Sequence, residues 1–192
     1  MSEAPISIWS EGRLTVVDVE GNGQQPPGLV ELAVVPILDG VIGEPTSWLL
    51  RPAEPITGFA SRIHGIKNAD VAGAPTLEDV RDDVLDVLVA RAVVAHNAHV
   101  DVSVLTRELG DWQPAEVLDT LKLARKLMPG RPSYKLGSLV AELELDKGLP
   151  DGLVPHRATY DALVAARLFV HLMTLGRALS EQQAETSDGA LF

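Results

Sequence analysis

The chain has 192 residues, a net charge of −11 and 46% hydrophobic residues. This length and apolar content predict one compact domain with a hydrophobic core. The absence of cysteine excludes disulfides, thiolate metal ligands and a cysteine nucleophile, so any chemistry depends on carboxylates, histidines and hydroxyls. The acidic balance argues against non-specific wrapping of long nucleic acid, although bound cations can invert the field at an acidic site.

Residues 1–12 lack a basic stretch followed by an apolar run, and no segment approaches the length needed to cross a bilayer. We therefore expect a cytoplasmic protein without membrane contact. The expected organisation is an N-terminal extension (1–12), one folded domain (13–176) and a mobile C-terminal tail (177–192), because the last residues are mostly polar.

Strands are predicted first along the chain. Runs rich in β-branched residues at 14–19 and 29–37 predict two strands, joined by the Gly/Pro/Gln-rich stretch 21–28, and a third strand is predicted at 47–50. Further strands, predicted at 92–95 and 117–119, alternate with helices. This order favours an α/β layer fold with a mixed sheet.

Helical spacing of apolar residues marks the helices. The first begins at a capping box formed by Thr76 and Asp79. In the last, Arg167 and His171 are the only polar residues between 162 and 173, so most of its circumference should be buried. The predicted helices are 76–90, 101–109, 121–127, 135–143 and 158–175.

Asp18 and Glu20 close the first predicted strand. Side chains alternate along a strand, so both carboxylates continue the row begun by Leu14 and Val16. Two acids beside an apolar strand repel each other unless a cation or protons compensate. The alternative is an exposed strand end that runs into a turn.

Two more acids and a histidine stand at element ends. Asp101 follows the strand at 92–95, where open α/β sheets bind ligands, although it could serve only as the N-cap of the next helix. Asp161 sits one turn into the apolar helix, where an unpaired charge needs a partner. His156 precedes that helix as a candidate base, or as an ordinary surface residue.

Taken together, these acids point to metal chemistry. Carboxylates from separate strand and helix ends can converge on two cations, an arrangement that lets one metal activate water and the other stabilise the leaving oxygen. All-oxygen ligation favours Mg²⁺ or Mn²⁺.

With these motifs assembled, the chain resembles the DEDD exonuclease superfamily, in its His-containing branch, and most of all the proofreading epsilon subunits of bacterial DNA polymerase III. The resemblance spans residues 14–173. The motifs that carry it, in chain order, are Asp18-Val19-Glu20, Ile63-His64-Gly65-Ile66, His96-Asn97-Ala98-His99-Val100-Asp101, Asp119-Thr120 and His156-Arg157-Ala158-Thr159-Tyr160-Asp161.

The resemblance implies a ribonuclease-H-like mixed β-sheet flanked by helices, with an exonuclease domain over 13–176. It implies that Asp18, Glu20, Asp101 and Asp161 hold two divalent cations and that His156 takes a proton from the attacking water. The implied reaction is 3′→5′ release of nucleoside 5′-monophosphates from single-stranded or frayed DNA ends. Alternatives that stay open are an exoribonuclease for short RNA and an inactive nuclease-like binding module.

Substrate contacts are expected beside the carboxylates. Two departures from the family affect them: Gly21 and Asn22 stand where relatives have threonines, and Val100 stands where relatives often have Phe. Backbone amides would then grip the 3′ end. The expected substrate-binding residues are Gly21, Asn22, His64, Gly65, Ile66 and Asn97.

Two features concern partners. Residues 121–135 contain five basic residues and no acid, which indicates a phosphate-binding surface or an ordinary solvated face. The final residues 188–192 loosely resemble peptides that dock in bacterial sliding clamps, so a clamp or a DNA polymerase is a further candidate partner. The basic residues are Lys122, Arg125, Lys126, Arg131 and Lys135.

Overall fold

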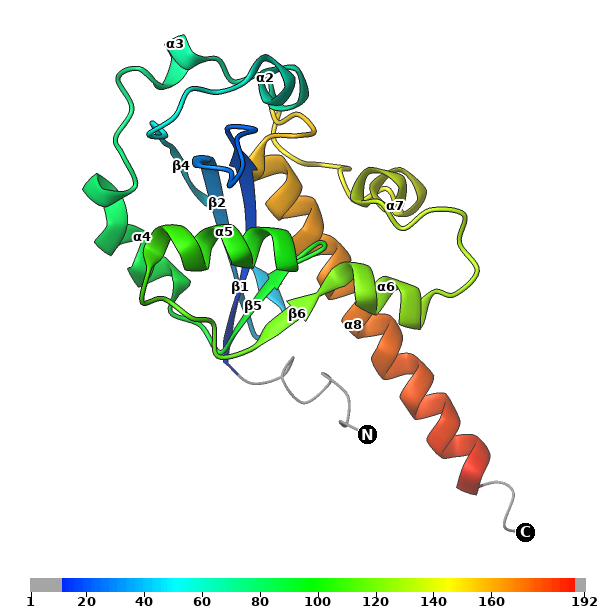
Figure 1. The fold of residues 1–192 in the computed structure, drawn as a ribbon. Coiled ribbons are helices and arrows are strands. Elements are labelled where there is room, and N and C mark those ends of the chain that lie inside the picture. The colour runs from blue at the N-terminus through cyan, green and yellow to red at the C-terminus, as the bar shows by residue number, and fades with distance from the viewer. Residues whose placement is uncertain (1–11, 189–192) are drawn as a thin grey trace.

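A computed structural model describes residues 12–188 of the chain. It shows a six-stranded mixed sheet flanked by helices (Figure 1), with the strand order β3-β2-β1-β5-β6 and β4 paired to β2. The expected α/β fold with a mixed sheet is confirmed. The strands are β1 (Arg13–Gly21), β2 (Leu29–Leu38), β3 (Val41–Ile42), β4 (Thr46–Leu49), β5 (Ala92–Ala95) and β6 (Val117–Asp119).

The sheet is antiparallel at one end and parallel at the other. Strand β1 pairs antiparallel with β2 and parallel with β5, and β5 pairs parallel with β6. The carboxyl ends of β1, β5 and β6 therefore meet at one edge of the sheet. Ligand sites of open α/β sheets form at such an edge.

Helices cover both faces of the sheet (Figure 1). Thr76 and Asp79 form the predicted capping box, with Thr76 N–H to Asp79 Oδ2 at 2.8 Å and Asp79 N–H to Thr76 Oγ1 at 3.4 Å. The segment that follows is a 3₁₀ turn and then a helix. The described helices are α2 (Gly58–His64), α3 (Asn68–Val71), η1 (Glu78–Val80), α4 (Arg81–Leu88), α5 (His99–Leu109), α6 (Thr120–Leu127), α7 (Leu136–Leu143) and α8 (Ala158–Asp188).

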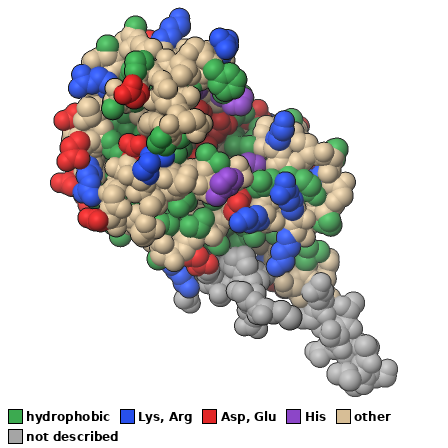
Figure 2. Space-filling model, in the orientation of Figure 1, with side chains coloured by type: hydrophobic (Ala, Val, Ile, Leu, Met, Phe, Trp, Pro, Cys, Tyr) green, Lys and Arg blue, Asp and Glu red, His purple; other side chains and the backbone are tan. Residues whose placement is uncertain are grey.

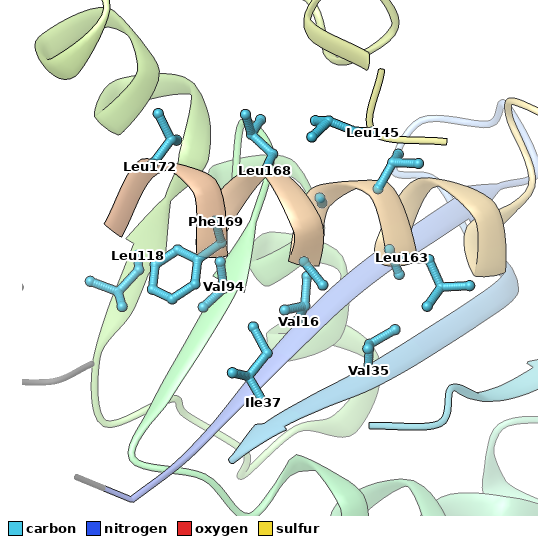
Figure 3. Packing of buried hydrophobic residues seen from close by; sticks show 14 of the residues in the cluster. Val16, Val35, Ile37, Val94, Leu118, Leu145, Leu163, Leu168, Phe169 and Leu172 are labelled. Atoms are coloured by element: carbon cyan, nitrogen blue, oxygen red, sulfur yellow. The ribbon is translucent and has the colours of Figure 1, made fainter. Parts of the chain in front are cut away.

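Strand β1 separates two apolar layers because its side chains alternate. Leu14 and Val16 pack toward α8, in a cluster that contains Phe169 and Leu168 (Figure 3). Val17 points the other way, into the cluster formed with α4 and α5. Every second residue of β1 thus faces α8, and this places Asp18 and Glu20 on the α8 side.

Helix α8 differs from the prediction at its end. It continues to Asp188, through most of the region 177–192 that was expected to be a mobile tail. The segment 158–182 is long and apolar enough to cross a membrane by length and composition alone, so the expectation that no segment reaches that length was wrong. In the structure 56% of its most apolar window is buried. Its contacts with β1 and β2 mark it as a core helix.

The remaining differences are short elements. Neither α2, α3 nor the two-residue β3 was predicted, because each is too short to show a period. Most of the expected N-terminal extension, and residues 189–192 of the clamp-like peptide, lie outside the described residues.

Candidate active site

Three carboxylates meet at the carboxyl end of β1. Asp18 and Glu20 come from the strand, and Asp161 comes from the first turn of α8, which packs on the same face. One carboxylate oxygen from each lies within 4.8 Å of the other two. The expected convergence of these acids is therefore present.

Asp101 approaches this group from the opposite side of β1. It lies in the first turn of α5 and is 5% exposed. Its Oδ1 accepts a hydrogen bond from the backbone N–H of Val19, between the two strand acids, at 3.1 Å. The alternative that Asp101 serves only as an N-cap was wrong, since the helix begins at His99 and Ala98 is the N-cap.

Burial and mutual repulsion act on all four acids. Burial, followed by the charges of Asp101 and Asp161, raises the pKa of Asp18 well above its usual range. Burial raises the pKa of Glu20 to about 8 and that of Asp101 to about 7. The pKa of Asp161 is also raised by burial. The ionised form of these carboxylates is therefore unfavourable unless a cation neutralises it, which is typical of a cation-binding site.

His156 stands at the entrance to α8. Its side chain is exposed and its backbone adopts φ 62°, in the left-handed region. Its N–H donates to Asp161 Oδ2 at 3.0 Å, which ties the loop to the carboxylate group. The ring therefore sits beside the acids without being locked into the protein interior.

A cleft of about 1220 Å³ opens over the site, between α8 and the segment that joins α6 to α7. Asp18, Asp161 and His156 line it together with Asn97. The Asn97 backbone has φ 66° and donates its N–H to Asp119 at 3.0 Å. Of the six expected substrate contacts, Asn97 is the one on the cleft wall.

The loop after Glu20 is built around Asn22. This residue is 1% exposed, and its Oδ1 accepts hydrogen bonds from the N–H groups of Gln24 and Gly28. Its Nδ2 donates to the Glu54 carbonyl at 3.1 Å. The side chain holds the loop that follows Gly21 and does not line the cleft.

His64, Gly65 and Ile66 form the end of α2. Gly65 is the C-cap, with φ 79°, while His64 and Ile66 are buried. The Ile66 N–H donates to His64 Nδ1 at 3.1 Å, and His64 Nε2 makes no hydrogen bond of normal geometry within residues 12–188. Burial lowers the pKa of His64, against the opposing effect of the Gly21 backbone. His64 is thus close to the loop that follows the strand acids.

The sequence analysis missed Glu31. It lies directly opposite Glu20 in the β1–β2 pairing and is 5% exposed. Both carboxylate oxygens of Glu31 accept hydrogen bonds from Arg157, and Oε2 also accepts the N–H of Ala158 at 2.9 Å. The only sequence signal was an acid within an otherwise apolar strand, and it did not reveal a partner 126 residues away.

His96 is a second residue whose role was missed. One ring nitrogen lies 2.9 Å from Thr120 Oγ1 and the other lies 2.9 Å from the Tyr134 carbonyl oxygen. Burial lowers the pKa of His96. His96 therefore connects the end of β5 to α6 and to Tyr134 in the segment between α6 and α7, which forms the far wall of the cleft, opposite α8.

Comparison with known proteins decides the family. A family model described as "Exonuclease" matches residues 15–169. Exodeoxyribonuclease 10 of Escherichia coli (strain K12) is 38% identical over 172 residues, which cover 90% of this chain and 74% of that protein. The chain belongs to the exonuclease family. The resemblance to the DEDD exonucleases is confirmed, and the protein is an exonuclease by family.

Two further comparisons agree. The DNA polymerase III epsilon subunit of Aquifex aeolicus is 29% identical over 169 residues, covering 85% of this chain and 81% of that subunit. The solved structure of exonuclease X in complex with 5′ overhanging duplex DNA superimposes with a TM-score of 0.72 at 39% identity. That match covers 84% of this exonuclease and 91% of the solved chain. The ribonuclease-H-like fold expectation is confirmed.

Proposed function

We propose that this exonuclease removes nucleoside 5′-monophosphates one at a time from the 3′ end of single-stranded or frayed DNA, in a reaction that needs two divalent cations. The observation that carries the proposal is the cluster of Asp18, Glu20 and Asp161, whose carboxylate oxygens lie within 4.8 Å of one another. Asp101 is held against the same strand.

These residues fit divalent cations. All the donors are carboxylate oxygens, the kind of ligand that Mg²⁺ and Mn²⁺ prefer. Arg157 lowers the pKa of Glu20, against the larger effect of burial, and Glu31 already pairs with this arginine. Bound cations would supply Lewis acidity and neutralise charge on the scissile phosphate. Asp18, Glu20, Asp101 and Asp161 would hold them.

His156 supplies the base. Its ring lines the same cleft as Asp18 and Asp161 while remaining exposed, so it can reach a water molecule beside the bound phosphate. Imidazole accepts a proton near neutral pH, which carboxylates engaged with cations cannot do. The hydrogen bond from the His156 backbone N–H to Asp161 holds His156 close to this carboxylate.

DNA is the proposed substrate class because the relative with 38% identity is named an exodeoxyribonuclease and the related structure contains duplex DNA. A clamp or polymerase partner stays a prediction, since most of the clamp-like peptide lies outside the described residues. In the cytoplasm such an enzyme would meet both DNA and RNA ends.

The test uses matched DNA and RNA single strands of one sequence, each labelled at the 3′ or the 5′ terminus. We expect the 3′-labelled DNA to lose its label first as a labelled mononucleotide, while the 5′-labelled strand shortens stepwise. Faster release from RNA would favour the exoribonuclease alternative. Release of mononucleotides from the 5′ end would overturn the proposal. So would the absence of any release with both Mg²⁺ and Mn²⁺.

A further inference from the structure

The far wall of the cleft carries positive charge. Two of the five basic residues in 121–135, Arg125 and Lys135, line the cleft that also contains Asp18, His156 and Asp161. Figure 2 shows Lys and Arg side chains gathered over α6, to the right in this view. The cleft therefore combines acids at the reacting centre with cations on the opposite wall.

The other three basic residues are placed differently. Lys122 lies 4.0 Å from Asp119, and Arg131 forms an ion pair with Glu142. Lys126 is exposed on α6 but is not part of the cleft lining. The structure thus separates a group that the sequence presents as one basic surface.

Arg125 and Lys135 are not neutralised by acids. Neither has an ion-pair partner within the part of the chain that the structure describes. No lining residue from α6 or the α6–α7 segment is acidic, and the first turn of α7 contains no acid. Asp146, the remaining acid on the cleft, lies beyond α7.

The wall is held rigidly. The Arg125 guanidinium lies 5.9 Å from the centre of the Tyr134 ring, and the Tyr134 hydroxyl donates to the Met128 carbonyl at 2.8 Å. His96 contacts the Tyr134 carbonyl oxygen from the other side. A guanidinium held against an aromatic ring, as in Arg125, loses less freedom when it binds an anion than a free side chain does.

We propose that Arg125 and Lys135 bind backbone phosphates of the single strand upstream of its terminal nucleotide, and so guide the 3′ end to the carboxylates. This inference rests on the proposed function and adds the residues that hold the strand. Phosphate contacts are indifferent to sequence, which suits an enzyme that removes every nucleotide in turn. The low aromatic content, 4%, leaves few alternatives in base stacking.

The test measures binding of a fluorescent ten-nucleotide single strand by anisotropy across a salt series, with chelator present to prevent hydrolysis. The logarithm of the binding constant should fall with the logarithm of salt concentration. Arg125→Gln and Lys135→Gln should each reduce that slope by about 0.7, the value for one phosphate contact on a single strand. Each should weaken binding roughly fivefold at moderate salt.

Lys126→Gln is the matched control, because it removes the same charge from the same helix outside the cleft. It should leave the slope close to that of the wild type. Equal effects from Lys126→Gln and Arg125→Gln would overturn the inference, since net charge alone would then explain binding. Absence of wild-type binding, or unchanged slopes in Arg125→Gln and Lys135→Gln, would overturn it as well.

A second measurement separates this inference from the proposed function. With Mg²⁺ present, KM for strands of three, six and ten nucleotides should fall with length in the wild type and stay nearly flat in Arg125→Gln/Lys135→Gln. A protein that binds strands through these residues but releases no mononucleotide would contradict the proposed function alone. A KM that still falls with strand length in the double variant would contradict only the inference that Arg125 and Lys135 bind upstream phosphates.

Discussion

Glu31 and Arg157 form an ion pair that joins β2 to the start of α8. The guanidinium donates to both carboxylate oxygens, with Nε at 3.0 Å from Oε2. Glu31 lies opposite Glu20 in the sheet, and Arg157 directly follows His156. The pair therefore connects β2, the strand that pairs with the one carrying Asp18 and Glu20, to the loop that carries His156.

Removal of Arg157 should destabilise the fold. Arg157→Gln leaves the buried Glu31 without its counter-charge beside Asp18, Glu20 and Asp161, which should cost about 3 kcal/mol of unfolding free energy. Urea denaturation with saturating Mg²⁺ measures the loss. The double variant Glu31→Gln/Arg157→Gln should lose much less than the sum of the single variants, because each single variant leaves one charge unpaired and the double variant leaves none. Additive losses would show that the two side chains act independently.

Asn22→Ala should lower stability rather than act on substrate alone. The variant leaves the N–H groups of Gln24 and Gly28 without their acceptor in a half-buried loop, at a cost of about 1 kcal/mol. Thermal unfolding checks this, with Gln25→Ala, at an exposed position of the same loop, as the control. An unchanged melting temperature together with a raised KM would instead support the expected direct contact between Asn22 and the 3′ end.

The clustered acids should destabilise the protein when no cation is bound. Their pKa values are raised in the folded state, so folding stability is greatest where they are protonated and falls as pH rises through about 7 to 8. In chelator the melting temperature should therefore be lower at pH 8 than at pH 6. Asp18→Asn should raise the melting temperature at pH 8 and flatten this dependence.

Added Mg²⁺ should reverse the loss in the wild type, with a larger rise in melting temperature at pH 8 than at pH 6. Asp18→Asn should respond much less. An equal response to Mg²⁺ in both proteins would place the cation elsewhere.

His156→Asn distinguishes the proposed role of His156 as a base from the proposed metal binding by the carboxylates. Asparagine tolerates the left-handed backbone at this position, so the loop should keep its shape. We expect kcat to fall by about 10²- to 10⁴-fold while Mg²⁺ binding by calorimetry and the urea midpoint stay unchanged. A kcat within a few-fold of the wild type would remove His156 from the reaction.

Much of this site follows from local sequence signals. Alternation along β1 predicts that Asp18 and Glu20 share a face, and the apolar surroundings of Asp161 predict that it needs a partner. Glu31 could not be found in this way, since its partner Arg157 is distant in the chain and each residue alone looks ordinary. The end of α8 was placed too early, because the polar residues after 176 still support a helix that leaves the core.

The most direct test of the central claim is the initial rate of mononucleotide release from a 3′-labelled DNA single strand as Mg²⁺ is returned to chelator-stripped protein. We predict no release without the cation, a saturable rise with Mg²⁺ in the wild type and almost no rise in Asp18→Asn. Release that is independent of Mg²⁺, or equal in Asp18→Asn, would contradict the assignment of the carboxylates.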